Sequence, residues 1–177
     1  MKMKTTIKDV HIGSKFRFGQ IEFVKLDTLT NGCLCLATDV LFKNCFDESN
    51  KNNWEISSLR QKLAEVIGDY ICKNALIPFY RDLTTDDGLT DYGSCADSVS
   101  MLTCNEYRKY RKFIPKIEEW YWTITADSPE YSNFIRFVLP DGSLDNYDTY
   151  FGNGGVRPLI CLNNRTLVEV ENAKDKG

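Results

Sequence analysis

Hydrophobic and polar positions alternate near the start of the chain, and this alternation predicts a small sheet. It runs through 15–18 and 20–27, and each segment would place one face on the core. Asn31-Gly32 then predicts a hairpin turn, because both residues tolerate a positive φ. The predicted return strand, 33–37, would point its two cysteines to one face and its two leucines to the other.

Two later segments have the spacing of helices. Between 57 and 70, apolar residues recur every three to four positions, and Ser57 or Ser58 is placed to cap the start. A second helix is predicted over 105–113, because the Thr-x-x-Glu sequence at 103–106 has the spacing of a capping box.

The last third alternates short apolar segments with loops built mainly from Tyr, Asn, Asp, Ser and Thr. Strands are predicted over 121–125, 133–139, 143–147 and 156–162, with a turn at Asp141-Gly142. A shorter strand is expected at 99–102. Together these patterns predict an α+β fold with short antiparallel strands, two main helices and long loops.

The chain of 177 residues has the length of one domain, 1–177. Within it we expect an N-terminal β-hairpin region, 13–37, and a body, 38–165. The charged end, 170–177, is predicted to be a frayed tail. No internal repeat or change of composition divides the chain.

The net charge of the chain makes some classes of binding partner less favourable. A formal net charge of −3 disfavours binding to nucleic acid, which needs clustered positive charge. The basic run 108–112 is interpreted as the solvated face of a helix. No signal peptide or membrane-spanning segment is recognised, so we expect no membrane partner. The expected location is the cytoplasm of the producing cell, or a virion assembled there.

The residues that usually carry catalysis form no convincing group. His11 is the only histidine and lies far in sequence from other polar clusters. The seven cysteines lack CxxC spacing and an export signal, so they are interpreted as small buried thiols. The glycine-rich segment 152–155 lacks the following Lys-Ser or Lys-Thr of a phosphate-binding loop and is interpreted as a tight turn. No catalytic residue is predicted.

One acidic loop contains weak candidates for a metal site. Asp82, Asp86, Asp87 and Asp91 could offer several oxygen ligands to calcium, which is the one cofactor considered. The spacing does not match the helix-loop-helix calcium motif. A solvated loop of Asx turns is the alternative interpretation.

The late loops are the strongest candidate for function. Their tyrosines offer large, stiff contact areas, and their short polar side chains adapt their hydrogen bonds to a partner. The predicted partner-binding residues are Tyr131, Asn133, Asp145, Asn146, Tyr147, Asp148, Thr149, Tyr150 and Asn153.

Several motifs together resemble an uncharacterised domain family of gut bacteria and their phages. They are Trp54 with 57–63, the tryptophan-rich 120–123, the Asp-Gly pair at 141–142 and the Gly-Val-Arg-Pro segment at 155–158. The resemblance extends from Gly13 to Leu162 and implies a C-type lectin-like fold. Arg157, inside an otherwise apolar strand, is expected to be buried and paired with a carboxylate or carbonyls.

The same fold occurs in two groups with known uses of it. Formylglycine-generating enzymes use a cysteine pair near the end of the domain, whereas Cys161 has no close partner in this sequence. Variable proteins of diversity-generating retroelements bind ligands through loops before the terminal strand, and 123–153 is similar in position and composition. The triplets of calcium-dependent carbohydrate binding, Glu-Pro-Asn and Trp-Asn-Asp, are absent.

The expected function is therefore recognition without catalysis, by a module of phage or prophage origin that binds a protein or glycan through the late loops. One alternative is a small intracellular phage inhibitor of a host defence protein. Another is a cysteine- or metal-dependent enzyme of the formylglycine-generating type. That enzyme would bring Cys95, Cys104 or Cys161 close to another thiol or to the acidic loop. The sequence leaves the oligomeric state open.

Overall fold

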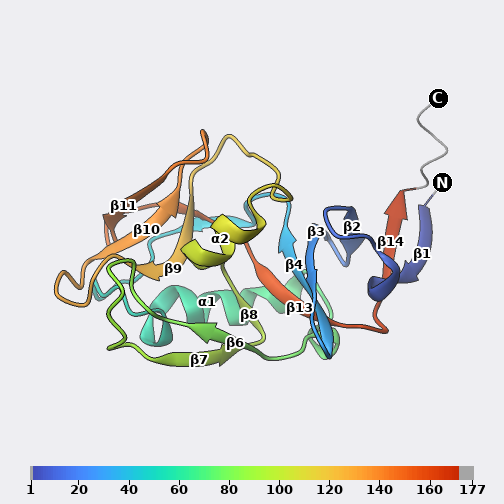
Figure 1. The fold of residues 1–177 in the computed structure, drawn as a ribbon, viewed down its shortest axis with the longest axis horizontal. Helices are drawn as coiled ribbons and strands as arrows, with labels where there is room; N and C mark the ends of the chain where they lie inside the picture. Colours follow the sequence, from blue (N-terminus) through green and yellow to red (C-terminus); the bar gives the residue numbers. More distant parts are fainter. Residues whose placement is uncertain (1, 172–177) are drawn as a thin grey trace.

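The computed structural model describes residues 2–171 and has an α+β fold in which most strand pairs are antiparallel (Figure 1). A seven-stranded sheet contains, in spatial order, β1 (Lys2–Thr6), β14 (Leu167–Glu171), β2 (Lys15–Phe18), β3 (Ile21–Thr28), β4 (Gly32–Ala37), β13 (Leu159–Asn163) and β8 (Val99–Ser100). A five-stranded sheet contains β11 (Leu144–Asp148), β10 (Phe134–Val138), β9 (Tyr121–Ala126), β12 (Gly154–Val156) and β5 (Phe42–Asn44). The other elements are the hairpin of β6 (Phe79–Asp82) and β7 (Ser94–Asp97), helices α1 (Ser58–Val66) and α2 (Cys104–Tyr110), and the 3₁₀ turns η1 (Ile7–Asp9), η2 (Trp54–Ile56), η3 (Ile67–Asp69) and η4 (Lys73–Ala75).

The centre of the seven-stranded sheet, at β4, is buried on both faces. The two cysteines of β4 belong to one hydrophobic cluster, together with Leu59 and Leu63 of α1. The two leucines of β4 belong to a second cluster, together with Tyr107 and Tyr110 of α2. The predicted alternation along β4 is therefore confirmed, and each face of the sheet shares its core with a different helix.

Both helices begin where their caps predict, and both end early. The Ser57 side chain accepts a hydrogen bond from the Arg60 N–H, and α1 gives way to η3 after Val66. The capping box of α2, formed by Thr103 and Glu106, is present. The helix ends at Tyr110, three residues before the predicted end, because the following N–H groups bond to carbonyls only three residues back.

The first hairpin lies where it was predicted, but its turn does not have the predicted geometry. Neither Asn31 nor Gly32 has a positive φ, and Gly32 already belongs to β4. The glycine is required for another reason: a Cβ at this position would lie 2.6 Å from Cys161 Sγ and 2.7 Å from the Leu162 carbonyl oxygen. Close strand packing, rather than a left-handed turn, selects it.

The predicted closing strand, 156–162, is in fact two strands in two sheets. Between them, Arg157 is buried and donates to the Ala37 carbonyl from Nε (2.8 Å) and to the Thr38 carbonyl from Nη2 (3.0 Å). Pro158 has no N–H to continue a ladder, so the chain changes sheets here. The expectation that Arg157 pairs with carbonyls is confirmed.

The N-terminal and C-terminal strands were not predicted. Strand β1 pairs with β14, with Met3 opposite Val170, so the predicted frayed tail is wrong for 170–171. The rest of that tail, 172–177, lies outside the described residues. Strands β1 and β14 lie at one end of the longest axis, and the loop between β9 and β10 lies at the other (Figure 1).

The β6–β7 hairpin was also not predicted, because the composition of its residues is typical of an apolar link followed by a polar loop. Its anchor is Arg81, whose side chain is 1% exposed and forms two hydrogen bonds of 2.7 Å with the Glu106 carboxylate. Arg81 also donates to the Met101 carbonyl (2.8 Å). Because this pairing satisfies a buried charge, it fixes β6 against the start of α2.

Candidate functional site

The predicted partner-binding residues lie at one end of the five-stranded sheet, on β11 and on the loops 127–133 and 149–153. Four aromatic side chains there are exposed: Tyr131 by 66%, Tyr147 by 46%, Tyr150 by 51% and Phe151 by 74%. We call these residues, with Asn133, Asp145, Asn146, Asp148 and Asn153, the loop surface. Phe151 was missed, because a single apolar residue in a polar loop has no periodic signal.

Some members of the predicted set shape the surface rather than face outward. Asn133 donates to the Asp148 carboxylate (3.2 Å), and that carboxylate accepts the N–H groups of Tyr150 (2.9 Å) and Phe151 (3.2 Å). Asp148 therefore holds the turn that presents the two aromatic rings. Thr149, which we expected on the surface, is fully buried, and that prediction is wrong.

Thr149 ties the 149–153 loop to an earlier segment of the chain. Its hydroxyl donates to the side-chain carbonyl of Asn50 (2.8 Å). Its backbone carbonyl accepts the N–H groups of Phe46 (2.9 Å) and Asp47 (3.1 Å). Its own N–H donates to the Asn133 carbonyl (2.9 Å), so this one residue joins both late loops.

Asn52 performs the same task for the 127–133 loop and is also fully buried. Its amide nitrogen lies within hydrogen-bonding distance of the carbonyl oxygens of Ser128 (2.9 Å), Tyr131 (3.2 Å) and Phe134 (2.8 Å). Its amide oxygen accepts the Tyr92 hydroxyl (2.6 Å). Segment 46–52 thus fixes the backbone of both loops, and no periodic pattern in the sequence indicated this.

The glycines at 152–155 are a third feature that holds the 149–153 loop in place. A Cβ at Gly152 would lie 2.4 Å from the Trp122 ring, and a Cβ at Gly154 would lie 2.5 Å from the Trp120 ring. Trp120 in turn lies 6.0 Å, between ring centroids, from Tyr147. The described backbone of 152–155 has no positive φ, so these glycines permit close packing of tryptophan rather than a left-handed turn.

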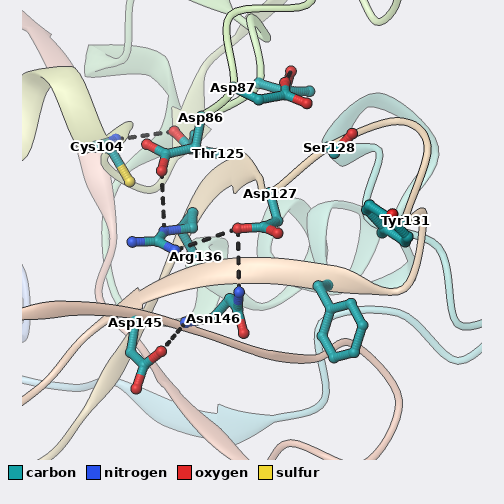
Figure 2. Close-up of polar contacts among 12 residues, drawn as sticks. Asp86, Asp87, Cys104, Thr125, Asp127, Ser128, Tyr131, Arg136, Asp145 and Asn146 are labelled. Carbon is teal, nitrogen blue, oxygen red and sulfur yellow. Dashed lines mark hydrogen bonds and ion pairs between the residues drawn. The ribbon is translucent and has the colours of Figure 1, made fainter.

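A charged network lies beside β10 and β11 and includes one member of the loop surface, Asn146 (Figure 2). Arg136 approaches Asp86 (Nε to Oδ2, 3.5 Å) and Asp127 (Nη1 to Oδ1, 3.3 Å). The side-chain amide of Asn146 donates to the same Asp127 oxygen (3.2 Å). Asp86 also pairs with Arg108 (3.2 Å). The network balances its charges and sets the orientation of Asn146.

The acidic loop uses its carboxylates within the protein. Asp82 accepts the N–H and the hydroxyl of Thr84, and Asp87 accepts the hydroxyl of Thr85. Hydrogen bonds from Thr85 and Ser128 lower the pKa of the Asp87 carboxyl. Across residues 2–171, no three His, Cys, Asp or Glu side chains are grouped as metal ligands. The carboxylates of Asp82 and Asp87 thus accept hydrogen bonds within the loop, and that of Asp86 forms ion pairs.

The cysteines differ in exposure, and within the described residues all are free thiols. The expectation of buried thiols is confirmed for Cys33, Cys35, Cys104 and Cys161, whereas Cys72 is exposed and Cys45 and Cys95 are partly exposed.

Cys104 meets the location that the enzyme alternative requires, since it lines a cavity of about 360 Å³ together with Asp82 and Asp86. Burial raises the pKa of the Cys104 thiol. Burial, and then proximity to Cys33, raises the pKa of Cys161 to about 11. Because the thiolate is the nucleophilic form, neither environment activates sulfur.

Comparison with known proteins assigns no relative: the chain matches no protein-family model, no curated protein and no solved structure. Among the described residues, no helix has the length and apolar character needed to cross a membrane.

Proposed function

We propose that the chain is a non-enzymatic recognition module of C-type lectin-like fold and of phage or prophage origin, which binds a protein or glycan through the loop surface. One observation supports this most: four exposed aromatic rings stand on backbones that buried hydrogen bonds hold in place. Exposed aromatic rings gathered in one region are typical of an interaction site, and a fixed backbone reduces the entropy lost on binding.

The residue types of the loop surface fit recognition. Tyrosine has few rotatable bonds and combines an apolar ring with a hydroxyl, so it serves as an anchor for protein surfaces and sugar rings alike. Asn153 and Asp145 are exposed beside these rings and provide adaptable hydrogen bonds. The indole of Trp120 and the ring of Phe137 support Tyr147 from behind.

The charge of this region favours a basic partner. The exposed charged side chains on the two loops and β11 are Glu130 and Asp145, and both are acidic. A partner with a basic face would be steered to this surface, with an association rate that falls as salt rises. The alternative function, an intracellular phage inhibitor of a host defence protein, uses the same surface and differs in compartment and partner.

Four residues of the motifs that carry the family resemblance occupy structural positions, as the proposed fold requires. Trp54 and Trp122 are buried, Gly142 has a positive φ in the β10–β11 turn, and Arg157 lies where the chain changes sheets. The cysteine-dependent alternative has weaker support, because burial raises the pKa of both Cys104 and Cys161.

The test compares binding by the wild-type chain and by a Tyr147→Ala/Tyr150→Ala/Phe151→Ala variant. The probes are a glycan array and immobilised chain incubated with lysate of candidate host bacteria, with captured proteins quantified by mass spectrometry. We expect the variant to lose at least about thirtyfold in affinity for any glycan or protein that the wild type retains, as for central aromatic anchors.

The matched control is Tyr80→Ala, because Tyr80 is 69% exposed but lies on β6, outside the loop surface. Circular dichroism and thermal unfolding establish that all variants fold. If a partner binds the triple variant as tightly as wild type, or is lost only with Tyr80→Ala, the loop surface is not the recognition site.

A further inference from the structure

A cavity of about 370 Å³ lies at the other end of the β10–β11 hairpin, away from the loop surface. It is formed between segment 111–117, which follows α2, and the hairpin turn 138–142, and we call it the hairpin-end cavity. In Figure 1 these two segments run side by side above α2. Part of its wall is apolar, with Ile114, Ile117 and Val138 among the lining residues.

The charged side chains of the basic run 108–112 have two different surroundings. Arg108 pairs with Asp86 (3.2 Å) and Lys109 pairs with Asp27 (3.3 Å). Arg111 and Lys112 instead line the hairpin-end cavity, and Lys116 lines it with them. The charged side chains that line the cavity are therefore all positive.

Among the described residues, no carboxylate forms an ion pair with Arg111, Lys112 or Lys116, and none lines the cavity. The acid nearest in sequence on the turn, Asp141, accepts hydrogen bonds from the N–H (2.8 Å) and hydroxyl (2.6 Å) of Ser143. Hydrogen bonds from Ser143, and then the charges of Lys116 and Arg111, lower the pKa of the Asp141 carboxyl, so this acid offsets part of their charge. Three positive side chains line the cavity, and their field attracts an anion.

The inner end of the cavity offers a neutral hydrogen-bond donor. Tyr107 and Tyr121 both line it and are each 4% exposed. The Tyr107 hydroxyl donates to the Gly142 carbonyl (2.8 Å), whereas the Tyr121 hydroxyl faces the Arg157 guanidinium and can accept from it while its own O–H stays available to donate. Burial, opposed by nearby Arg157, raises the pKa of Tyr121 to about 12, so its hydroxyl keeps its proton.

Arg157 lies directly behind this wall. Its guanidinium carbon is 4.9 Å from the centroid of the Tyr121 ring, and its Nη2 donates to the carbonyl of Pro115, another lining residue (3.0 Å). The side chain is 1% exposed. A buried cation directly behind the wall adds positive potential to the cavity and favours a negative ligand.

We infer that the hairpin-end cavity binds a small organic anion, namely an apolar ring or chain that carries a phosphate or carboxylate group. The anionic group lies among Arg111, Lys112 and Lys116, and the apolar body packs on Ile114 and Val138. The Tyr121 hydroxyl donates to the ligand from below. The volume matches the lower end of the range for small-molecule sites. This inference stands independently of the loop surface.

The first test is a titration followed by backbone amide NMR, with phenyl phosphate and benzoate as probes and with phenol and inorganic phosphate as controls. We expect shifts in amides of 111–117 and 138–142, with a dissociation constant on the order of 1 mM for such small ligands. Phenol and inorganic phosphate should bind at least about tenfold more weakly, because each lacks half of the recognised chemistry. Tighter binding of phenyl phosphate or of benzoate identifies which anionic group the site prefers.

The second test uses variants. Arg111→Gln/Lys116→Gln should weaken binding of the better probe by at least about tenfold, and Tyr121→Phe by about threefold to tenfold. The control, Lys8→Gln/Lys51→Gln, removes two exposed charges elsewhere and should leave affinity unchanged. The inference is overturned if neither probe shifts these amides at about 10 mM, or if the two double variants bind equally. The loop-surface variant should bind the probe like wild type, so this test and that of the recognition function fail separately.

Discussion

The side-chain amide of Asn52 donates a hydrogen bond to the backbone carbonyl of Tyr131 (3.2 Å), across 79 residues of sequence. Tyr131 is exposed, whereas Asn52 is fully buried. A buried amide thus holds the backbone from which an exposed aromatic ring projects. Because a loop held only by its ends would sample many backbone conformations, this bond converts a flexible tyrosine into a preorganised one.

Replacing Asn52 by leucine should destabilise the protein and loosen the 127–133 loop. The change leaves carbonyls of that loop and the Tyr92 hydroxyl without their buried partner, which costs about 2–4 kcal/mol of unfolding free energy. Urea denaturation measures the loss, and hydrogen exchange should show faster exchange at 128–134. Asn74→Leu, at an exposed position in η4, should change stability by less than about 0.5 kcal/mol.

Replacing Gly154 by alanine should disturb both tryptophans beneath the loop surface. Its Cβ would lie 2.5 Å from the Trp120 ring and 2.6 Å from the Trp122 ring, so the indoles must move, at a cost of about 1–3 kcal/mol. Tryptophan fluorescence should shift together with the unfolding midpoint.

The matched control for this change is Gly88→Ala, where a Cβ would meet open space. It should cost about 1 kcal/mol from its positive φ alone and leave the fluorescence unchanged. Equal fluorescence changes in both variants would contradict the packing role of Gly154.

Asp27 should contribute to the loss of stability in acid. Partial burial tends to raise the pKa of its carboxyl, but hydrogen bonds from Tyr110, the Thr28 N–H and Lys109 outweigh this and lower it. A lowered pKa in the folded state gives stability that is complete above the unfolded value of about 3.9 and disappears as pH falls through the folded value.

We therefore expect the difference in unfolding free energy between wild type and Asp27→Asn to shrink between about pH 6 and about pH 2. Urea denaturation at both pH values measures it. Glu65→Gln, which removes an exposed carboxylate on α1, should show no comparable change. A constant difference for Asp27→Asn would mean that these hydrogen bonds do not favour the charged carboxylate.

Thiol labelling of the native protein should separate the cysteines by exposure. Cys72 is exposed and should react first with iodoacetamide at neutral pH, whereas Cys35 is buried and burial raises its pKa well above the ordinary value. Peptide mapping by mass spectrometry reads the order of reaction. Early labelling of Cys104 or Cys161 would instead revive a reactive-thiol function.

Local patterns were sufficient for elements that depend on local forces. The capping box of Thr103 and Glu106, the Ser57 cap, and the β10–β11 turn at Gly142 were all predicted, because neighbouring residues alone determine them. Strand β14 was missed although Val168-Glu169-Val170-Glu171 alternates apolar and charged residues, because its partner β1 lies at the other end of the described chain.

The loop surface also has features that composition predicted and features that only tertiary contacts determine. Composition indicated that the late loops carry exposed tyrosines, and Tyr131, Tyr147 and Tyr150 are indeed exposed. It could not distinguish the exposed Tyr150 from the buried Thr149 beside it, because both are polar loop residues. Only the contact with Asn50 decides that Thr149 faces inward.

By itself, the sequence determined the α+β class, the start of each helix and the late loops that carry exposed tyrosines, because caps, turns and hydrophobic alternation act over a few residues. Tertiary structure alone decided that the last predicted strand divides at Arg157 between two sheets, that Asn52 holds Tyr131, and that Arg111 and Lys116 share a cavity. These relationships join residues far apart in the chain, and their energies exist only once the fold has brought the partners together.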